Sequence, residues 1–458
     1  MSKELIKKYD VVVVGGGISG CMAAIAAARA GSAVLLVEKY GFLGGTLTAC
    51  GTGPMMTFHA GDKLVVRGIC NELIERLKKK GLSTGHIFDT IRYTYTVTPF
   101  DAEGMKRELE EMCIEAGVTL LYHTYATDAV CRQNKITSIE IAHKSGKTKI
   151  EGRVYVDATG DCDLTYLLGR DYVQGRMQDG KTQPLTMNFK ICNVNLEKVK
   201  EYIRANPEQF PCLKGDAGVI EKAPRLSMGG YIDLLKRAIA EKRVSFLRED
   251  VLFFETNTKG ELIVNTTRVL DVDPTDPVDL TRAEILGRRQ AMELFQLLKK
   301  EVGGFEDAIL EYTGPFIGVR SSRQIVGKHT FSAQDVLNGT EFPDTVAYGG
   351  YPIDIHCPDG LAKEEEREAR FTSGKVYRIP LSCMYGEVRN LITVGRCISA
   401  TFEAQAAIRV SPIAGAIGHA GGVAASVCAS SGTDIQDVDI QVVKDILREQ
   451  DAYMESSF

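Results

Sequence analysis

The sequence predicts an α/β fold in which a parallel sheet is built from distant parts of the chain, with an α+β domain inserted between them. The first observation is "DVVVV" at 10–14, which is followed by three glycines and a run of small residues, as in strand, turn and helix. The second is a pair of later strand-and-glycine turns, "RVYVDATGD" ending at 161 and "NLITVGRCIS" ending at 399. The third is the mixed pattern of short strands and helices between these two turns.

The N-terminal element is a predicted β-α-β unit with the pattern G-x-G-x-x-G at Gly15, Gly17 and Gly20. The first glycine permits a tight turn, the second lets backbone approach a pyrophosphate, and the third lets helix and strand pack closely. The second strand, "SAVLLVEK", brings Glu38 to its end, where an acid binds ribose hydroxyls. The unit therefore predicts a Rossmann-like dinucleotide-binding domain, and a purely structural glycine turn is the alternative.

The later elements complete that domain. Gly44 and Gly45, followed by Thr46, form a predicted loop that can press backbone against a ligand. The C-terminal strand and small-residue helix are what this domain needs to finish its layers, so we expect the intervening block to be an insertion. The expected segments are 1–165 and 376–458 for the nucleotide-binding domain and 166–375 for an α+β substrate domain.

Composition limits the classes of function. The chain has 458 residues, 44% hydrophobic and 25% charged, with a formal net charge of −5, which is ordinary for a soluble globular protein and offers no basic footprint for nucleic acid. Glycines interrupt the apolar run at 11–28, which argues against a membrane segment or export signal. The twelve cysteines include no C-x-x-C, so we expect reduced thiols, no metal and a cytoplasmic location.

Four segments together resemble a known family: the β-α-β unit, "GFLGGT", "VDATGD" and the C-terminal "NLITVGRCISATFEAQAAIRVSPIAGAIGHAGG". They are similar to the FAD-dependent oxidoreductases of the glutathione-reductase-like flavoprotein superfamily. The chain most resembles a bacterial FAD-dependent oxidoreductase family, and more distantly the flavin subunit of heterodisulfide reductase and the fumarate reductase flavoproteins. The resemblance covers nearly the whole chain and implies FAD as the dinucleotide.

Carried over residue by residue, the resemblance implies a set of cofactor contacts. Val130 stands where such proteins touch adenine through backbone. The full set of implied cofactor residues is Gly15, Gly17, Ser19, Gly20, Glu38, Lys39, Gly44, Gly45, Thr46, Val130, Ala158, Gly160, Asp161, Gly395, Arg396 and Arg409.

The sequence also departs from these relatives. Arg396 follows Gly395 where many flavoproteins carry an Asp, which puts the expected ribityl contact in doubt. No His lies between Gly44 and Gly53, where the fumarate reductase relatives attach flavin, so we expect non-covalent FAD, with His59 the nearest candidate for attachment. Clustered cysteines for iron–sulfur centres, as in heterodisulfide reductase flavin subunits, are also missing.

Positive potential near the flavin is expected from the C-terminal motif. Ser411 and Pro412 suit the N-cap and first position of a helix whose unpaired N–H groups face the ligand. Arg409 precedes that helix and carries a permanent charge, with a surface ion pair as the alternative reading.

The predicted catalytic residues lie in the second segment. In a strand, Asp354 and His356 of "YPIDIH" share a face, so the Asp can set the tautomer of a proton-accepting His, beside Tyr351. On a helix, Arg320 and Arg323 share a face that suits a carboxylate, with interdomain salt bridges as the alternative.

The predicted function is an FAD-dependent dehydrogenase or reductase that transfers hydride between a small organic substrate and FAD. An electron-transfer subunit of a larger redox complex is the alternative, and a flavoprotein with largely structural FAD, serving RNA modification or cofactor assembly, is a third reading. A second G-x-G-x-x-G for a nicotinamide cofactor is not visible. We expect a small-molecule substrate, no nucleic-acid or membrane partner, and leave a homo-oligomer open.

Overall fold

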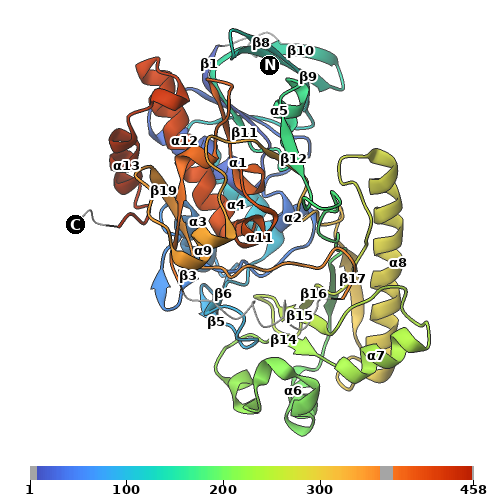
Figure 1. The fold of residues 1–458 in the computed structure, drawn as a ribbon. Helices are drawn as coiled ribbons and strands as arrows, with labels where there is room; N and C mark the ends of the chain where they lie inside the picture. Colours follow the sequence, from blue (N-terminus) through green and yellow to red (C-terminus); the bar gives the residue numbers. More distant parts are fainter. Residues whose placement is uncertain (1–7, 362–374, 456–458) are drawn as a thin grey trace.

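The centre of the protein is a five-stranded parallel sheet, as Figure 1 shows for the computed structural model, which describes residues 8–361 and 375–455. Its strand order is β21-β11-β1-β2-β7, and all four strand pairs are parallel. The strands are β1 (Tyr9–Val14), β2 (Val34–Val37), β7 (Thr119–Leu121), β11 (Gly152–Asp157) and β21 (Leu391–Thr393). This arrangement confirms the predicted α/β class and brings the three glycine turns to the carboxyl edge of one sheet.

Two small-residue helices, α1 (Ile18–Arg29) and α12 (Ser411–Ser431), pack tightly against each other beside this sheet. Gly418 and Gly422 permit the close approach, since a Cβ at either would lie 2.1 Å from the carbonyl oxygen of Ser19 or Ala23. Helix α12 is long and apolar enough to cross a membrane, but 89% of its most apolar window is buried inside the fold, as in a core helix.

A second, antiparallel sheet has the order β14-β15-β16-β13-β17, and α6, α7 and α8 lie around it (Figure 1). Its strands are β13 (Phe189–Cys192), β14 (Ser227–Gly230), β15 (Val251–Glu255), β16 (Leu262–Val264) and β17 (Ile309–Thr313), and its helices are α6 (Leu196–Ala205), α7 (Ile232–Ala240) and α8 (Pro277–Glu301). The buried residues of this second core run from Leu185 to Ile317. They all lie within the predicted insertion.

The chain then returns to the first core. Phe331, Val346, Tyr351 and Tyr377 pack with residues of β1 and α12 in one hydrophobic cluster. The second core is therefore narrower than the predicted segment 166–375, and the exact domain boundaries stay a prediction.

The remaining elements surround the two cores. The other helices are α2 (Thr46–Ala49), α3 (Ile69–Lys79), α4 (Ala102–Glu115), α5 (Asp163–Leu167), α9 (Ala333–Asn338), α11 (Phe402–Ile408) and α13 (Ile440–Glu449). The other strands are β3 (His59–Ala60), β4 (Lys63–Leu64), β5 (Ile87–Phe88), β6 (Thr96–Val97), β8 (Tyr125–Arg132), β9 (Lys135–His143), β10 (Gly146–Ile150), β12 (Tyr172–Gln174), β18 (Arg323–Ile325), β19 (Thr345–Gly349) and β20 (Tyr377–Pro380).

Candidate functional site

A cavity of about 480 Å³ runs from the carboxyl edge of the parallel sheet to the second sheet, within the usual size range of a ligand site. Its walls come from both sheets, because Val14 lies on β1 of the parallel sheet while Leu252 and Phe254 lie on β15 of the second sheet. Most of the predicted site residues line it, namely Gly15, Gly17, Ser19, Glu38, Lys39, Gly45, Thr46, Ala158, Gly160, Asp161, Arg320, Tyr351, Asp354, His356, Gly395, Arg396 and Arg409.

The first glycine turn presents open backbone to this cavity. Gly15 has φ +104°, and a Cβ there would lie 2.4 Å from the carbonyl oxygen of Ala158. A Cβ at Gly17, in contrast, would meet only the Cα of Gly45, at 3.9 Å, so the space in front of Gly17 is free. The two glycines serve different needs: Gly15 makes the turn, and Gly17 leaves room for a ligand.

Glu38 lies at the end of β2, where the sequence predicts it. Its Oε2 accepts a hydrogen bond from Gly16 N at 2.5 Å, and its Oε1 accepts one from Tyr40 N at 2.8 Å. Burial raises the pKa of this carboxyl. A carboxylate has about four acceptor sites, so Glu38 retains capacity for ribose hydroxyls.

Two helices begin at the cavity wall without a side-chain cap. Helix α1 follows Gly17 and α12 follows Val410, and neither of these N-cap residues makes a side-chain capping hydrogen bond. Ser411 is the first helical residue rather than the predicted N-cap, because the extended residue at the start of α12 is Val410. Uncapped N–H groups and the positive ends of two helix dipoles therefore face the same space, which suits an anionic group.

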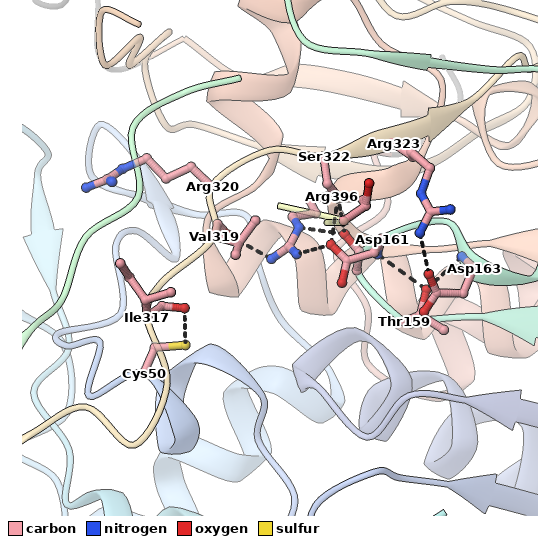
Figure 2. Close-up of polar contacts among 12 residues, drawn as sticks. Cys50, Thr159, Asp161, Asp163, Ile317, Val319, Arg320, Ser322, Arg323 and Arg396 are labelled. Carbon is pink, nitrogen blue, oxygen red and sulfur yellow. Dashed lines mark hydrogen bonds and ion pairs between the residues drawn. The ribbon is translucent and has the colours of Figure 1, made fainter. Parts of the chain in front are cut away.

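The second and third glycine turns are joined by Arg396, which Figure 2 shows among its partners. Its Nε donates to Gly160 O at 2.7 Å, its Nη1 to Val319 O at 2.8 Å, and its Nη2 lies 2.9 Å from Asp161 Oδ1. Burial alone would raise the pKa of Asp161, but Arg396 and Lys39 lower it below its usual value. Arg396 thus links two turns of the first domain to the loop that leaves the second sheet.

Four predicted site residues do not line the cavity. Gly20 supports packing, since a Cβ there would lie 1.8 Å from Gly15 O. Gly44 donates its N–H to Gly16 O at 2.9 Å and so shapes the loop. Val130 is 42% exposed on β8, outside the cavity, whose wall there is formed by Thr124, Tyr125 and Ala126. Arg323 is the fourth.

The predicted arginine pair is not formed. Arg320 lies in a loop and Arg323 begins β18, so no helix places them on one face. Arg323 donates to Asp163 at 2.8 Å, whereas Arg320 points away from the Arg396–Asp161 contacts (Figure 2). Only Arg320 remains at the cavity.

Asp354 is the centre of a buried polar group at the other end of the cavity. Tyr351 Oη donates to Asp354 Oδ2 at 3.0 Å, and Arg409 Nη2 lies 3.2 Å from the same oxygen. His356 Nε2 lies 3.2 Å from it as well. Residues 351–356 are irregular rather than the predicted strand, so a shared carboxylate oxygen, not strand alternation, brings Asp354 and His356 together.

These contacts and the burial of the ring determine the tautomer and the protonation state of His356. With Nε2–H directed to Asp354, Nδ1 is the acceptor nitrogen, and it is buried without a hydrogen-bond partner in the described structure. Burial first, and then the charge of Arg320, lower the pKa of His356 well below its ordinary value. His356 is therefore a neutral imidazole that lines the cavity, and the lone pair of its Nδ1 is unused among the described residues.

Sequence reasoning missed several residues at this end. Arg248, Asn188 and Asn265 line the cavity, and each has a buried side-chain atom without a partner in the described structure. Asn188 precedes β13, Arg248 precedes β15 and Asn265 follows β16. The available signal was polar side chains at the ends of buried strands, but their convergence depends on antiparallel pairing that was not predicted.

Among the described residues, no group of three or more His, Cys, Asp and Glu side chains is placed to hold a metal ion. The twelve cysteines are all free thiols. Thiol reactivity needs a low pKa, and burial raises the pKa of Cys50, which lines the cavity, to about 12.

Relatives cover parts of this chain. Digeranylgeranylglycerophospholipid reductase 1 of Methanococcoides burtonii is 28% identical over 163 residues, which is 33% of this chain and 38% of that protein. Dihydrolipoamide dehydrogenase of Chaetomium thermophilum is 25% identical over 151 residues, 33% of this chain and 28% of that protein. The matches thus span well under half of these curated relatives.

A solved structure shares the fold over nearly the whole chain. The flavin-dependent brominase Bmp2 aligns with a TM-score of 0.51 at 11% identity, covering 97% of this chain and 84% of that one. At this identity the likeness concerns the fold alone.

The cavity fits FAD in several respects: an open backbone at Gly17, two uncapped helix N-termini and an acid at the end of β2. The model of the FAD dependent oxidoreductase family matches residues 10–447, almost the full length. The chain is an enzyme of the FAD dependent oxidoreductase family, with FAD as its cofactor.

Proposed function

We propose that this protein is a dehydrogenase or reductase that transfers hydride between a small organic substrate and non-covalently bound FAD. The observation that carries the proposal is His356, a buried residue that lines the same cavity as the cofactor-binding turns and whose Nδ1 has no hydrogen-bond partner among the described residues. Removing hydride from a CH–OH or CH–CH bond requires a base for the accompanying proton, and a neutral imidazole is suited to that role.

FAD, when bound, supplies the hydride-accepting or hydride-donating chemistry. The chain's own residues handle the proton. His356 Nδ1 takes a proton from the substrate in oxidation and returns it in reduction. Asp354 holds the ring through Nε2, and Tyr351 and Arg409 hold Asp354 in turn. Asp354 also stabilises the imidazolium while the proton resides on His356.

The position of His59, the nearest candidate for covalent attachment of the flavin, supports non-covalent binding. His59 does not line the cavity, and its Nδ1 lies 2.8 Å from Thr96 Oγ1, on the strand pair β5–β6. A side chain engaged there is not directed at the cofactor turns. Denaturation in acid should therefore release all the flavin into the supernatant.

We favour a small-molecule substrate over the electron-transfer alternative, because a buried proton acceptor has no use in passing electrons to a partner protein. The expected cytoplasmic location and the absence of nucleic-acid and membrane partners remain part of the proposal. The oligomeric state stays open.

The test is anaerobic bleaching of the bound flavin against a panel of hydroxy acids, alcohols, sugars and enoates. His356→Asn should slow bleaching by roughly 100-fold or more, the usual contribution of a general base, while FAD content stays unchanged. His329→Asn is the matched control, because His329 lies outside the cavity. Bleaching at the parent rate in His356→Asn, or a purified protein unable to bind FAD, would overturn the proposal.

A further inference from the structure

Four arginines lie close to one another around Arg320, and the charges of two of them, Arg320 and Arg409, act on His356. Arg248, Arg320 and Arg409 line the cavity, and Arg268 lies close enough for its charge to lower the pKa of Arg320. Among the described residues, Arg248, Arg268 and Arg409 pair with Glu249, Asp250 and Asp354. Buried charges are costly unless they are compensated, so an arginine of this group without such a pair needs an explanation.

Arg320 is the arginine of this group that has no carboxylate partner among the described residues. Its Nη1 donates to Pro184 O at 2.5 Å and to Thr186 Oγ1 at 2.6 Å, and among the described residues no carboxylate lies within 4.0 Å of it. Burial and the charges of Arg409 and Arg248 lower the pKa of this guanidinium well below its usual value. Among the described residues, the Arg320 guanidinium thus donates to neutral oxygens, and the charge of Asp354 only partly offsets the burial and the neighbouring arginines.

The neighbouring arginines are also incompletely satisfied. Arg248 is 7% exposed, its Nη1 has no partner, and its carboxylate contacts are long, at 3.4 Å to Asp250 and 3.9 Å to Glu249. Arg409 Nε is likewise buried without a partner. Donors of three guanidinium groups at one cavity wall match an anion that accepts several charge-assisted hydrogen bonds.

We propose that the substrate is a small carboxylate, held by Arg248, Arg320 and Arg409 with its reacting carbon beside His356. The inference rests on the proposed function and names the substrate class of that same site. A carboxylate suits the proposed reaction because it acidifies the C–H bond on the carbon next to it, and so eases removal of a proton by His356.

Binding of the carboxylate also prepares the base. In the free protein the charge of Arg320 helps to lower the pKa of His356. A bound anion neutralises that charge, so the pKa of His356 rises and the ring accepts a proton more readily. Substrate specificity and catalysis are then coupled, because a neutral substrate of the same shape leaves the pKa of His356 low and the ring a weak base.

The binding test uses FAD-loaded protein and pairs of ligands that differ only in charge, malonate against malonamide and lactate against lactamide. Binding is followed by the flavin difference spectrum and by calorimetry. The carboxylate should bind roughly tenfold or more tightly than its amide, as expected for a charged hydrogen bond. Arg248→Met and Arg320→Met should each remove that preference, whereas Arg289→Met, an exposed arginine of α8, should retain it.

A second measurement detects the coupling to His356. At pH 6, calorimetry of malonate binding in buffers of different ionisation enthalpy should show proton uptake by the parent protein. His356→Asn should bind malonate without that uptake. This readout does not depend on turnover or on knowing the natural substrate.

Each outcome decides the inference. Equal binding of acid and amide, or full preference in both folded arginine variants, would overturn it and assign the arginines to interdomain packing. If Arg320→Met does not fold, Arg248→Met decides alone, because its carboxylate contacts are long. A protein that binds FAD and is bleached by neutral substrates only would refute the carboxylate while leaving the proposed function intact.

Discussion

Replacing Gly17 with Ala should impair FAD binding without weakening the fold. Gly17 has φ −66° and ψ 175°, a conformation open to any residue, and an added Cβ meets no atom nearer than 3.9 Å. The apo protein should therefore be about as stable as the parent, because a gain of about 0.4–1 kcal/mol from the lower entropy of the unfolded chain offsets the poorer N-cap propensity of Ala at the start of α1.

The loss of affinity follows from the ligand that this space serves. A methyl group in front of the uncapped N-terminus of α1 displaces an anionic group from the N–H donors. Loss of one hydrogen bond to a charged group costs about 1.5–3 kcal/mol, so FAD should bind roughly 10- to 100-fold more weakly.

The assay is titration of apo protein with FAD, followed by flavin fluorescence, beside urea unfolding of the apo form. Gly20→Ala is the matched control within the same motif, because its Cβ would lie 1.8 Å from Gly15 O. That variant should lose stability, by roughly 1–3 kcal/mol as for other overpacked sites. Parent-like FAD affinity in Gly17→Ala, or equal destabilisation by both substitutions, would refute the division of roles.

The remaining predictions concern stability. Burial lowers the pKa of His419 to about 4, below its ordinary value, so the unfolded chain binds an extra proton between pH 6.5 and 4. Stability should fall as pH falls through this window, by up to about 3 kcal/mol, and His419→Gln should flatten the curve measured by urea unfolding. Arg396→Met should cost roughly 1–3 kcal/mol, because Asp161 loses its ion pair and keeps the hydrogen bond from Ser322, while Gly160 O and Val319 O lose a donor. A double-mutant cycle with Asp161→Asn should show a coupling energy above about 1 kcal/mol, and additive losses would contradict the link.

The parallel sheet could be predicted from sequence because its signals are local. A run of buried β-branched residues followed by a glycine turn recurs at β1, β11 and β21, and each reports its own strand and bend. Parallel neighbours in such a sheet bring their carboxyl ends together, so the positions of Gly15, Gly160 and Gly395 at one cavity follow from the strands.

The second domain gives weaker signals. The sequence shows strands and helices there, but the order β14-β15-β16-β13-β17 depends on β13, which pairs with β16 and β17 from much later in the chain. Arg320 and Arg323 illustrate the consequence, since their spacing suits a helix while tertiary contacts place one in a loop and the other in a strand. Asp354 and His356 were predicted to interact, and they do, although a shared oxygen rather than a strand brings them together.

The part of the cavity beside His356 contains buried polar side chains that destabilise the fold. The glycine turns and the Arg396–Asp161 pair satisfy their own polar groups, and the same contacts that shape the cofactor site also stabilise the protein. Arg320, the free nitrogen of His356 and the unpartnered N–H of Arg248 do the opposite, because each is buried without full compensation. A protein retains such groups where a ligand supplies their missing partners. A ligand that pairs with Arg248 and Arg320 and reacts with His356 must carry both a negative charge and a removable proton.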